Sequence, residues 1–137
     1  MRPGITVLLV DDEVPFVATL AKRLERREFT VLRAHGGIEG LELLRRNAVD
    51  VVVLDVNMPD MDGMRVLREI RLRHPDVAVC MLTGHADMEA AIAGMAMGAF
   101  DYLMKPVELD ELIRKIMDAC FRSRRGEEAC GVGKPSI

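Results

Sequence analysis

The sequence predicts a doubly wound α/β fold built on a five-stranded parallel sheet. Short runs of apolar, largely β-branched residues alternate five times with longer stretches whose apolar residues recur at helical spacing. The most apolar run, VVVL at residues 51–54, has no polar interruption, which is typical of a strand buried on both faces. Five strand–helix units on one chain imply parallel strands with helices on both faces of the sheet.

The first half of the chain contains three predicted strands and two helices. The strands are expected at residues 5–10, 29–34 and 50–56. The first helix begins at Glu13, because Phe16, Leu20 and Leu24 then share one face. The second helix, at about residues 38–46, follows a pair of glycines.

In the second half, a Pro-Asp-Met-Asp-Gly turn leads into a helix at residues 64–73, which His74-Pro75 closes. Two further strands are expected at residues 77–82 and 100–104, and two helices at residues 87–97 and 108–122. The last helix opens with three carboxylates, the charge that a helix N-terminus prefers.

The helix at residues 87–97 stands out because no charge occurs between residues 90 and 100. We expect Met88, Ile92 and Met95 to face the core, which leaves Ala93 and Ala96 toward solvent. Two interpretations of this bare surface remain open: small exposed alanines need no explanation, or the surface binds a partner.

Length and composition narrow the class of protein. With 137 residues, half of them apolar and 30% charged, the chain suits one soluble globular domain. No apolar run approaches the ~20 residues that span a bilayer, and no signal peptide is evident, so we expect a cytoplasmic protein without membrane contact. Cys80, Cys120 and Cys130 are odd in number and lack metal-type spacing, so reduced thiols are expected.

The domain is expected to cover residues 1–122, with residues 123–137 forming a flexible tail or truncated linker of mixed Gly, Pro and charge. Residues 121–137 hold four Lys and Arg and two Glu, which leaves 15 basic and 20 acidic residues, a net charge of −5, on the rest. Such an acidic domain argues against direct contact with nucleic acid.

Polar residues come at the ends of four predicted strands. Asp11-Asp12 follows the first, Asp55 ends the third, Thr83 follows the fourth and Lys105 follows the fifth. Ligands of open parallel sheets bind beyond these carboxyl ends, so the five side chains are expected to converge. Clustered carboxylates repel one another unless cations lie between them. Lys105 supplies one positive charge. Mg²⁺ (or Mn²⁺), an ion that carboxylate and phosphate oxygens bind, would supply more.

With a metal bound, Asp55 can act as a nucleophile on phosphorus and form an acyl phosphate. Lys105 would then offset the phosphoryl charge, and the Thr83 hydroxyl would donate to a phosphoryl oxygen. Each residue alone has an ordinary structural explanation, such as a helix cap for the acidic pair. Their joint occurrence at four strand ends favours a functional site.

These residues resemble the receiver domains of two-component response regulators, over about residues 4–120. The resemblance depends on the acidic pair, on LDVNMPDMDG around Asp55, on LTG at Thr83 and on GAFDYLMKP, which ends at Lys105-Pro106. It implies a flavodoxin-like (βα)5 fold with strand order 2-1-3-4-5.

The resemblance also assigns roles. Asp55 would be the phospho-acceptor and would bind Mg²⁺ together with Asp11, Asp12 and the backbone carbonyl of Asn57. Lys105 would grip the phosphoryl group.

Thr83 and Tyr102 would form a switch pair, and Pro106 would follow a cis peptide bond. The resemblance marks the positions of Asn57 and His85 as those that tune the lifetime of the acyl phosphate. Since neither is a carboxylate, we expect a moderate lifetime. Gly84, where relatives often carry Ala, should leave the site at least as open.

The resemblance therefore predicts that the chain is a receiver, which takes a phosphoryl group from a sensor histidine kinase or phosphotransfer protein. The chain would catalyse only its own phosphorylation and dephosphorylation, and would not be an enzyme otherwise. Phosphorylation would switch a surface on residues 87–97, 100–104 and 108–122 that binds a downstream protein or a second copy.

Two alternatives remain. A degenerate receiver would bind partners without being phosphorylated, although the intact acidic, Thr and Lys residues argue against it. A phosphatase of the haloacid-dehalogenase type would also use a nucleophilic Asp, but it needs a second carboxylate two positions later, where this chain has Asn57.

Overall fold

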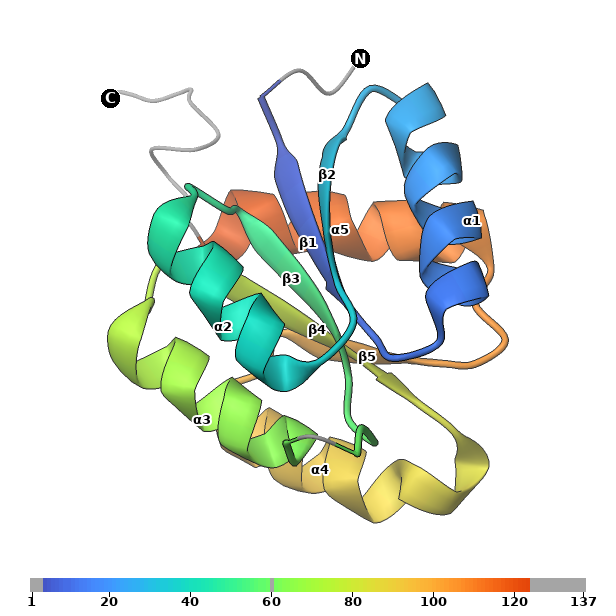
Figure 1. The fold of residues 1–137 in the computed structure, drawn as a ribbon. Helices are drawn as coiled ribbons and strands as arrows, with labels where there is room; N and C mark the ends of the chain where they lie inside the picture. Colours follow the sequence, from blue (N-terminus) through green and yellow to red (C-terminus); the bar gives the residue numbers. More distant parts are fainter. Residues whose placement is uncertain (1–3, 60, 124–137) are drawn as a thin grey trace.

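The computed structural model describes residues 4–59 and 61–123 and shows alternating strands and helices (Figure 1). The strands are β1 (Thr6–Val10), β2 (Thr30–Ala34), β3 (Val51–Asp55), β4 (Ala78–Thr83) and β5 (Asp101–Met104). The helices are α1 (Val14–Arg26), α2 (Gly37–Arg46), α3 (Gly63–Arg73), α4 (Met88–Ala96) and α5 (Leu109–Ser123), with a short 3-10 helix, η1 (His85–Asp87), before α4. The predicted elements are all present, with ends within about two residues of those expected from the sequence.

The five strands form one parallel sheet in the order β2-β1-β3-β4-β5, which confirms the predicted flavodoxin-like topology. β3 lies at its centre, and all five of its residues are buried. Because the strands are parallel, their carboxyl ends meet at one edge of the sheet. The order reverses between β1 and β3, the position at which sheets of this kind bind ligands.

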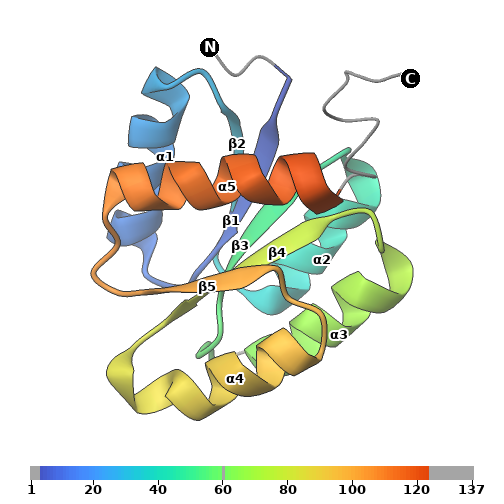
Figure 2. The same cartoon turned by 180° about the vertical axis from the view of Figure 1, so that it is seen from behind.

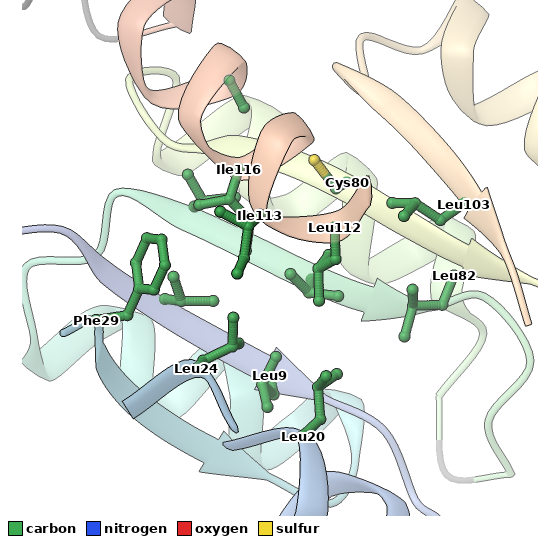
Figure 3. Close-up of a cluster of buried hydrophobic side chains, with 14 of the residues drawn as sticks. Leu9, Leu20, Leu24, Phe29, Cys80, Leu82, Leu103, Leu112, Ile113 and Ile116 are labelled. Carbon is green, nitrogen blue, oxygen red and sulfur yellow. The ribbon is translucent and has the colours of Figure 1, made fainter. Parts of the chain in front are cut away.

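Helices cover both faces of the sheet and create two hydrophobic cores. α2, α3 and α4 pack on one face (Figure 1), and α1 and α5 on the other (Figure 2). On the α1–α5 side, Leu20 and Leu24 from α1 and Leu112 and Ile116 from α5 belong to one buried cluster over the strands (Figure 3). Phe16, which was expected on the same face as Leu20, is only partly buried.

The orientation expected for α4 is wrong. Ala91 and Gly94 are its buried residues, whereas Ile92 is 65% and Met95 39% exposed. The small residues let the helix lie close to the sheet: a Cβ atom on Gly94 would be 2.3 Å from Met81 Sδ. α4 therefore presents large apolar side chains, as well as the expected exposed alanines, to solvent.

The structure also tests the broader expectations in part. None of the helices within the described residues combines the length and apolar character that crossing a bilayer requires. Cys80 and Cys120 are both buried. Cys130 and the expected tail, apart from Ser123, lie outside the described residues.

Candidate functional site

The polar residues at the strand ends are brought together at one edge of the sheet. Asp11 follows β1, Asp55 is the last residue of β3, Thr83 is the last residue of β4 and Lys105 follows β5. Since β3 pairs with both β1 and β4, Asp55 occupies the middle of this row. The edge therefore carries two buried carboxylates, a buried hydroxyl and an ammonium group.

The acidic residues form a compact cluster. One carboxylate oxygen from each of Asp11, Asp12 and Asp55 lies within 4.8 Å of the other two. Asp11 and Asp55 are buried and Asp12 is exposed, so the cluster opens toward solvent on one side. Backbone N–H groups two residues further along the chain donate to the buried pair: Glu13 N to Asp11 Oδ1 at 3.0 Å, and Asn57 N to Asp55 Oδ1 at 3.1 Å.

This cluster fits a hard divalent cation. Asp11 Oδ2 is buried and, within the described residues, accepts no hydrogen bond apart from its contact with the Lys105 ammonium. A buried carboxylate oxygen with so few donors is costly unless a cation is close. Three carboxylates with solvent access on one side match the ligands of Mg²⁺, which keeps several waters in its coordination shell. Asp11, Asp12 and Asp55 could therefore hold such an ion.

Lys105 lies between the acidic groups. Its Nζ is 2.8 Å from Asp11 Oδ2, 2.9 Å from Glu13 Oε1 and 3.8 Å from Asp55 Oδ2, and it lies 4.8 Å from the centre of the Phe16 ring. Burial alone would lower the pKa of Lys105, but its bonds to Asp11 and Glu13 reverse this effect and raise the pKa. The side chain is therefore positively charged at neutral pH.

Burial has the opposite consequence for Asp55. It raises the pKa of this carboxyl group from 3.8 to about 6, with the hydrogen bond from Asn57 N and the charge of Lys105 acting against the rise and the charges of Asp11 and Asp12 adding to it. Asp55 is thus an ionised carboxylate above that pH, held where its charge is poorly solvated. Such a group gains from a cation or a new covalent partner.

A pocket of about 300 Å³ lies over Asp55. Its lining residues come from the end of β3 and from the segments that follow β1, β3, β4 and β5, including η1: Asp12, Glu13, Asp55, Asn57, Gly84, Asp87 and Lys105. The pocket thus joins the acidic cluster, the ammonium group and the β4–α4 loop around one nucleophile.

Thr83 and Tyr102, the expected switch pair, lie on neighbouring strands. The Thr83 hydroxyl is buried and donates to the carbonyl of Gly84 at 3.1 Å. Tyr102 is half-buried and is in register with Met81, two residues before Thr83, which places Tyr102 and Thr83 on the same face of the sheet. Pro106 follows a cis peptide bond, as expected.

Two carboxylates at the site were not singled out from the sequence. Glu13 was expected only to begin the first helix, yet its side chain makes no cap bond and pairs with Lys105 across 92 residues of sequence. Asp87 was expected to begin a helix, and it lines the pocket over Asp55. The side chain of His85 is outside the described part of the chain.

The chain matches known proteins along most of its length. The family model described as "Response regulator receiver domain" matches residues 7–117. The chain is 39% identical over 117 residues to the transcriptional regulatory protein GlrR of Escherichia coli. This match covers 85% of the chain and 26% of GlrR. It is 39% identical over 132 residues to the transcriptional regulatory protein PrrA of Mycobacterium tuberculosis, covering 94% of this chain and 56% of PrrA. The chain thus spans between a quarter and just over half of these relatives.

Solved structures agree. A response regulator receiver domain protein from Clostridium thermocellum superimposes with a TM-score of 0.84 at 39% identity, covering 88% of this chain and 98% of that one. The receiver domain of NtrX from Brucella abortus gives a TM-score of 0.78 at 31% identity, covering 83% and 97%. Fold, family match and relatives together show that the chain belongs to the response regulator receiver domain family.

Proposed function

We propose that the chain is a phosphorylation switch in which Asp55 accepts a phosphoryl group from a sensor histidine kinase or a phosphotransfer protein. The observation that carries this proposal is the position of Asp55: a buried carboxylate with a pKa raised to about 6, which lines a pocket close to two further acids and to Lys105. Family membership supports the same chemistry.

The transfer is a displacement at phosphorus. An oxygen of Asp55 forms a bond to phosphorus while the P–N bond to the donor histidine breaks, and the imidazole keeps that electron pair and takes a proton from solvent. Lys105 Nζ, 3.8 Å from Asp55 Oδ2, offsets the charge of the transferring group. Thr83, at the end of the adjacent strand, supplies a hydroxyl donor to a phosphoryl oxygen once it turns from the Gly84 carbonyl.

Asp11, Asp12 and Asp55, with the backbone carbonyl of Asn57, would hold Mg²⁺ or Mn²⁺. The ion would supply charge stabilisation for the phosphoryl oxygens. Without the ion, Lys105 is the cation closest to Asp55 among the described residues. The negative charges of three carboxylates are then balanced by only one ammonium group. Phosphorylation is therefore expected to depend on the metal.

The downstream surface is proposed on α4, β5 and α5. α4 exposes Ile92 and Met95 beside Ala93 and Ala96, and Tyr102 connects β5 to the same core as Met81. A new dianion on Asp55 would draw Thr83 inward and bias the packing of α4, which changes the affinity of this surface for a protein partner or a second copy. The chain would have no catalytic activity beyond its own phosphorylation and dephosphorylation.

Intact mass after incubation with a small acyl phosphate and Mg²⁺ tests the proposal. The wild type should gain one phosphoryl group, and Asp55→Asn should gain none. Asp62→Asn is the matched control: Asp62 is exposed and caps α3 by accepting from Met64 N, which Asn can also do. This control should label like the wild type. Steady release of phosphate from a phosphomonoester would indicate a phosphatase instead, and a stable unlabelled protein would indicate a binding module.

A further inference from the structure

The geometry points to Asp87 as the residue that positions the water molecule for hydrolysis of the acyl phosphate on Asp55, an inference that rests on the proposed function. Asp87 comes from the β4–α4 loop and lines the pocket over Asp55. In the sheet, β3 with Asp55 lies between β1 and β4. Asp12 and Glu13 follow β1, whereas Asp87 follows β4, so Asp87 comes from the other side of Asp55.

The orientation of the Asp87 side chain is the second observation. Asp87 stands at the N-cap of α4, where an aspartate normally accepts a hydrogen bond from a backbone N–H of its own helix. Here the carboxylate makes no cap bond, and no ion pair with it occurs within the described residues. A carboxylate that stabilises neither its helix nor a cation remains available to water in the pocket.

Gly84 gives Asp87 access to the pocket. A Cβ atom on Gly84 would meet only one heavy atom within 4 Å, Asp87 Oδ2 at 3.6 Å. The Asp87 carboxylate therefore lies directly beside the backbone of Gly84, and no side chain at position 84 stands between them. The backbone bond from Asp87 N to the Gly84 carbonyl, 3.0 Å, keeps the two residues in this arrangement.

The chemical step is hydrolysis of a mixed anhydride. Asp87 accepts a hydrogen bond from a water molecule, whose oxygen attacks phosphorus. The bond between phosphorus and the Asp55 oxygen breaks, and Asp55 leaves as a carboxylate. The water proton passes to Asp87 and then to solvent, and inorganic phosphate is released.

This inference changes the expected lifetime of the phosphorylated state. Asn57 and His85 lack carboxylates, and on their account alone the lifetime would be moderate. If Asp87 positions the water molecule, the acyl phosphate on Asp55 is hydrolysed faster and its lifetime is shorter than Asn57 and His85 alone would give.

The test compares the decay of the phosphorylated protein in four forms. Wild type, Asp87→Asn, Asp87→Glu and Asp76→Asn are labelled with a small acyl phosphate and Mg²⁺ and freed of the donor, and the loss of the adduct is followed by intact mass. Asp76 is the matched control because it is an exposed aspartate that precedes β4, at the opposite end of that strand from the pocket.

Asp87→Asn should slow the decay about tenfold. This effect is smaller than the ~100-fold or more that a fully engaged general acid–base group contributes, because Asp87 is only half-buried. Asp87→Glu should recover part of the rate, and Asp76→Asn should match the wild type. Labelling of Asp87→Asn should be no slower than that of the wild type, since removing an anion favours an anionic donor. Slower decay without slower labelling is not expected from a purely structural role of Asp87.

Unchanged decay in Asp87→Asn would overturn the inference while leaving the proposed function intact. The same holds if labelling and decay slow by one common factor. A higher Mg²⁺ requirement with unchanged decay would also overturn it, because Asp87 would then act on the metal shell. Absence of any adduct in the wild type would instead overturn the proposed function, and this inference with it.

Discussion

Lys105 is held closer to Glu13 than to Asp55: its Nζ lies 2.9 Å from Glu13 Oε1 and 3.8 Å from Asp55 Oδ2. Glu13 is largely exposed, whereas Asp55 is buried. The ammonium group that would neutralise a phosphoryl group is thus partly engaged elsewhere in the resting protein. Glu13 therefore holds part of the Lys105 charge in the resting protein, and under the proposed function a phosphoryl group on Asp55 would compete for it.

Glu13→Gln should speed the phosphorylation of Asp55 by a small acyl phosphate. The substitution frees Lys105 toward Asp55 and removes one negative charge from the pocket mouth, which favours an anionic donor. We expect an initial rate about threefold higher, because an exposed charge contributes about 0.2–1 kcal/mol. Glu28→Gln, an exposed glutamate beyond the end of α1, serves as control and should leave the rate unchanged. A slower rate in Glu13→Gln would show that Glu13 assists the transfer.

Asp55→Asn should stabilise the metal-free protein at neutral pH. The pKa of Asp55 is about 6 in the folded protein and 3.8 ordinarily, so the folded state holds this proton more tightly than the unfolded state. The free energy of unfolding therefore falls as pH rises from about 4 to 6, and stays lower above pH 6. Removing the carboxylate should recover on the order of 2 kcal/mol at pH 7.5 and almost nothing at pH 4.

Urea unfolding in the presence of a chelator, from pH 4 to pH 8, measures this difference. A gap between Asp55→Asn and the wild type that does not change with pH would contradict the raised pKa. Added Mg²⁺ should then stabilise the wild type at pH 7.5 more than the variant, since binding to the folded state alone raises its stability.

Gly63→Ala should lower the free energy of unfolding by about 2 kcal/mol, a loss typical of an atom forced into a well-packed core. A Cβ atom at Gly63 would lie 2.6 Å from Val56 Cα and 2.7 Å from its carbonyl oxygen, and backbone atoms cannot move aside cheaply. Gly94→Ala is the comparison: its Cβ would meet the flexible end of Met81, and the gain in helix propensity offsets part of the cost. Thermal unfolding should rank Gly63→Ala as the less stable variant, and the reverse order would contradict this packing.

Ile92→Lys tests the surface of α4. Ile92 is 65% exposed, so the variant should unfold like the wild type while losing any self-association that phosphorylation induces. Leu72→Lys is the matched control, because Leu72 is 71% exposed and belongs to the neighbouring helix α3, outside the proposed surface on α4, β5 and α5. Light scattering with and without beryllofluoride gives the mass of each form. A monomer in both states of the wild type would exclude the homodimer and leave a different protein as the partner.

Much of the fold and the row of residues around Asp55 could be predicted because they depend on local patterns. Asp11, Asp55, Thr83 and Lys105 occur where apolar runs end, and parallel strands bring such ends to one edge. The positions of these residues follow from the order of the elements, without knowledge of any single contact.

The errors concern contacts that no local pattern encodes. Ile92 and Met95 were expected in the core because large apolar residues usually drive burial, yet Gly94 and Ala91 face the sheet since only small residues allow α4 to approach Met81. Glu13 was expected only to begin a helix, because its partner in the structure, Lys105, is 92 residues away in the sequence.

Chemical trapping of the phosphorylated residue tests the central claim most directly. Borohydride converts an aspartyl phosphate to homoserine, and peptide mapping of the labelled, reduced wild-type protein locates it in the sequence. The account predicts homoserine at position 55 alone, and only when Mg²⁺ or Mn²⁺ was present during labelling. Homoserine at Asp11 or Asp12, or its absence from position 55 in protein that carries a phosphoryl group, would contradict the claim that Asp55 is the phospho-acceptor.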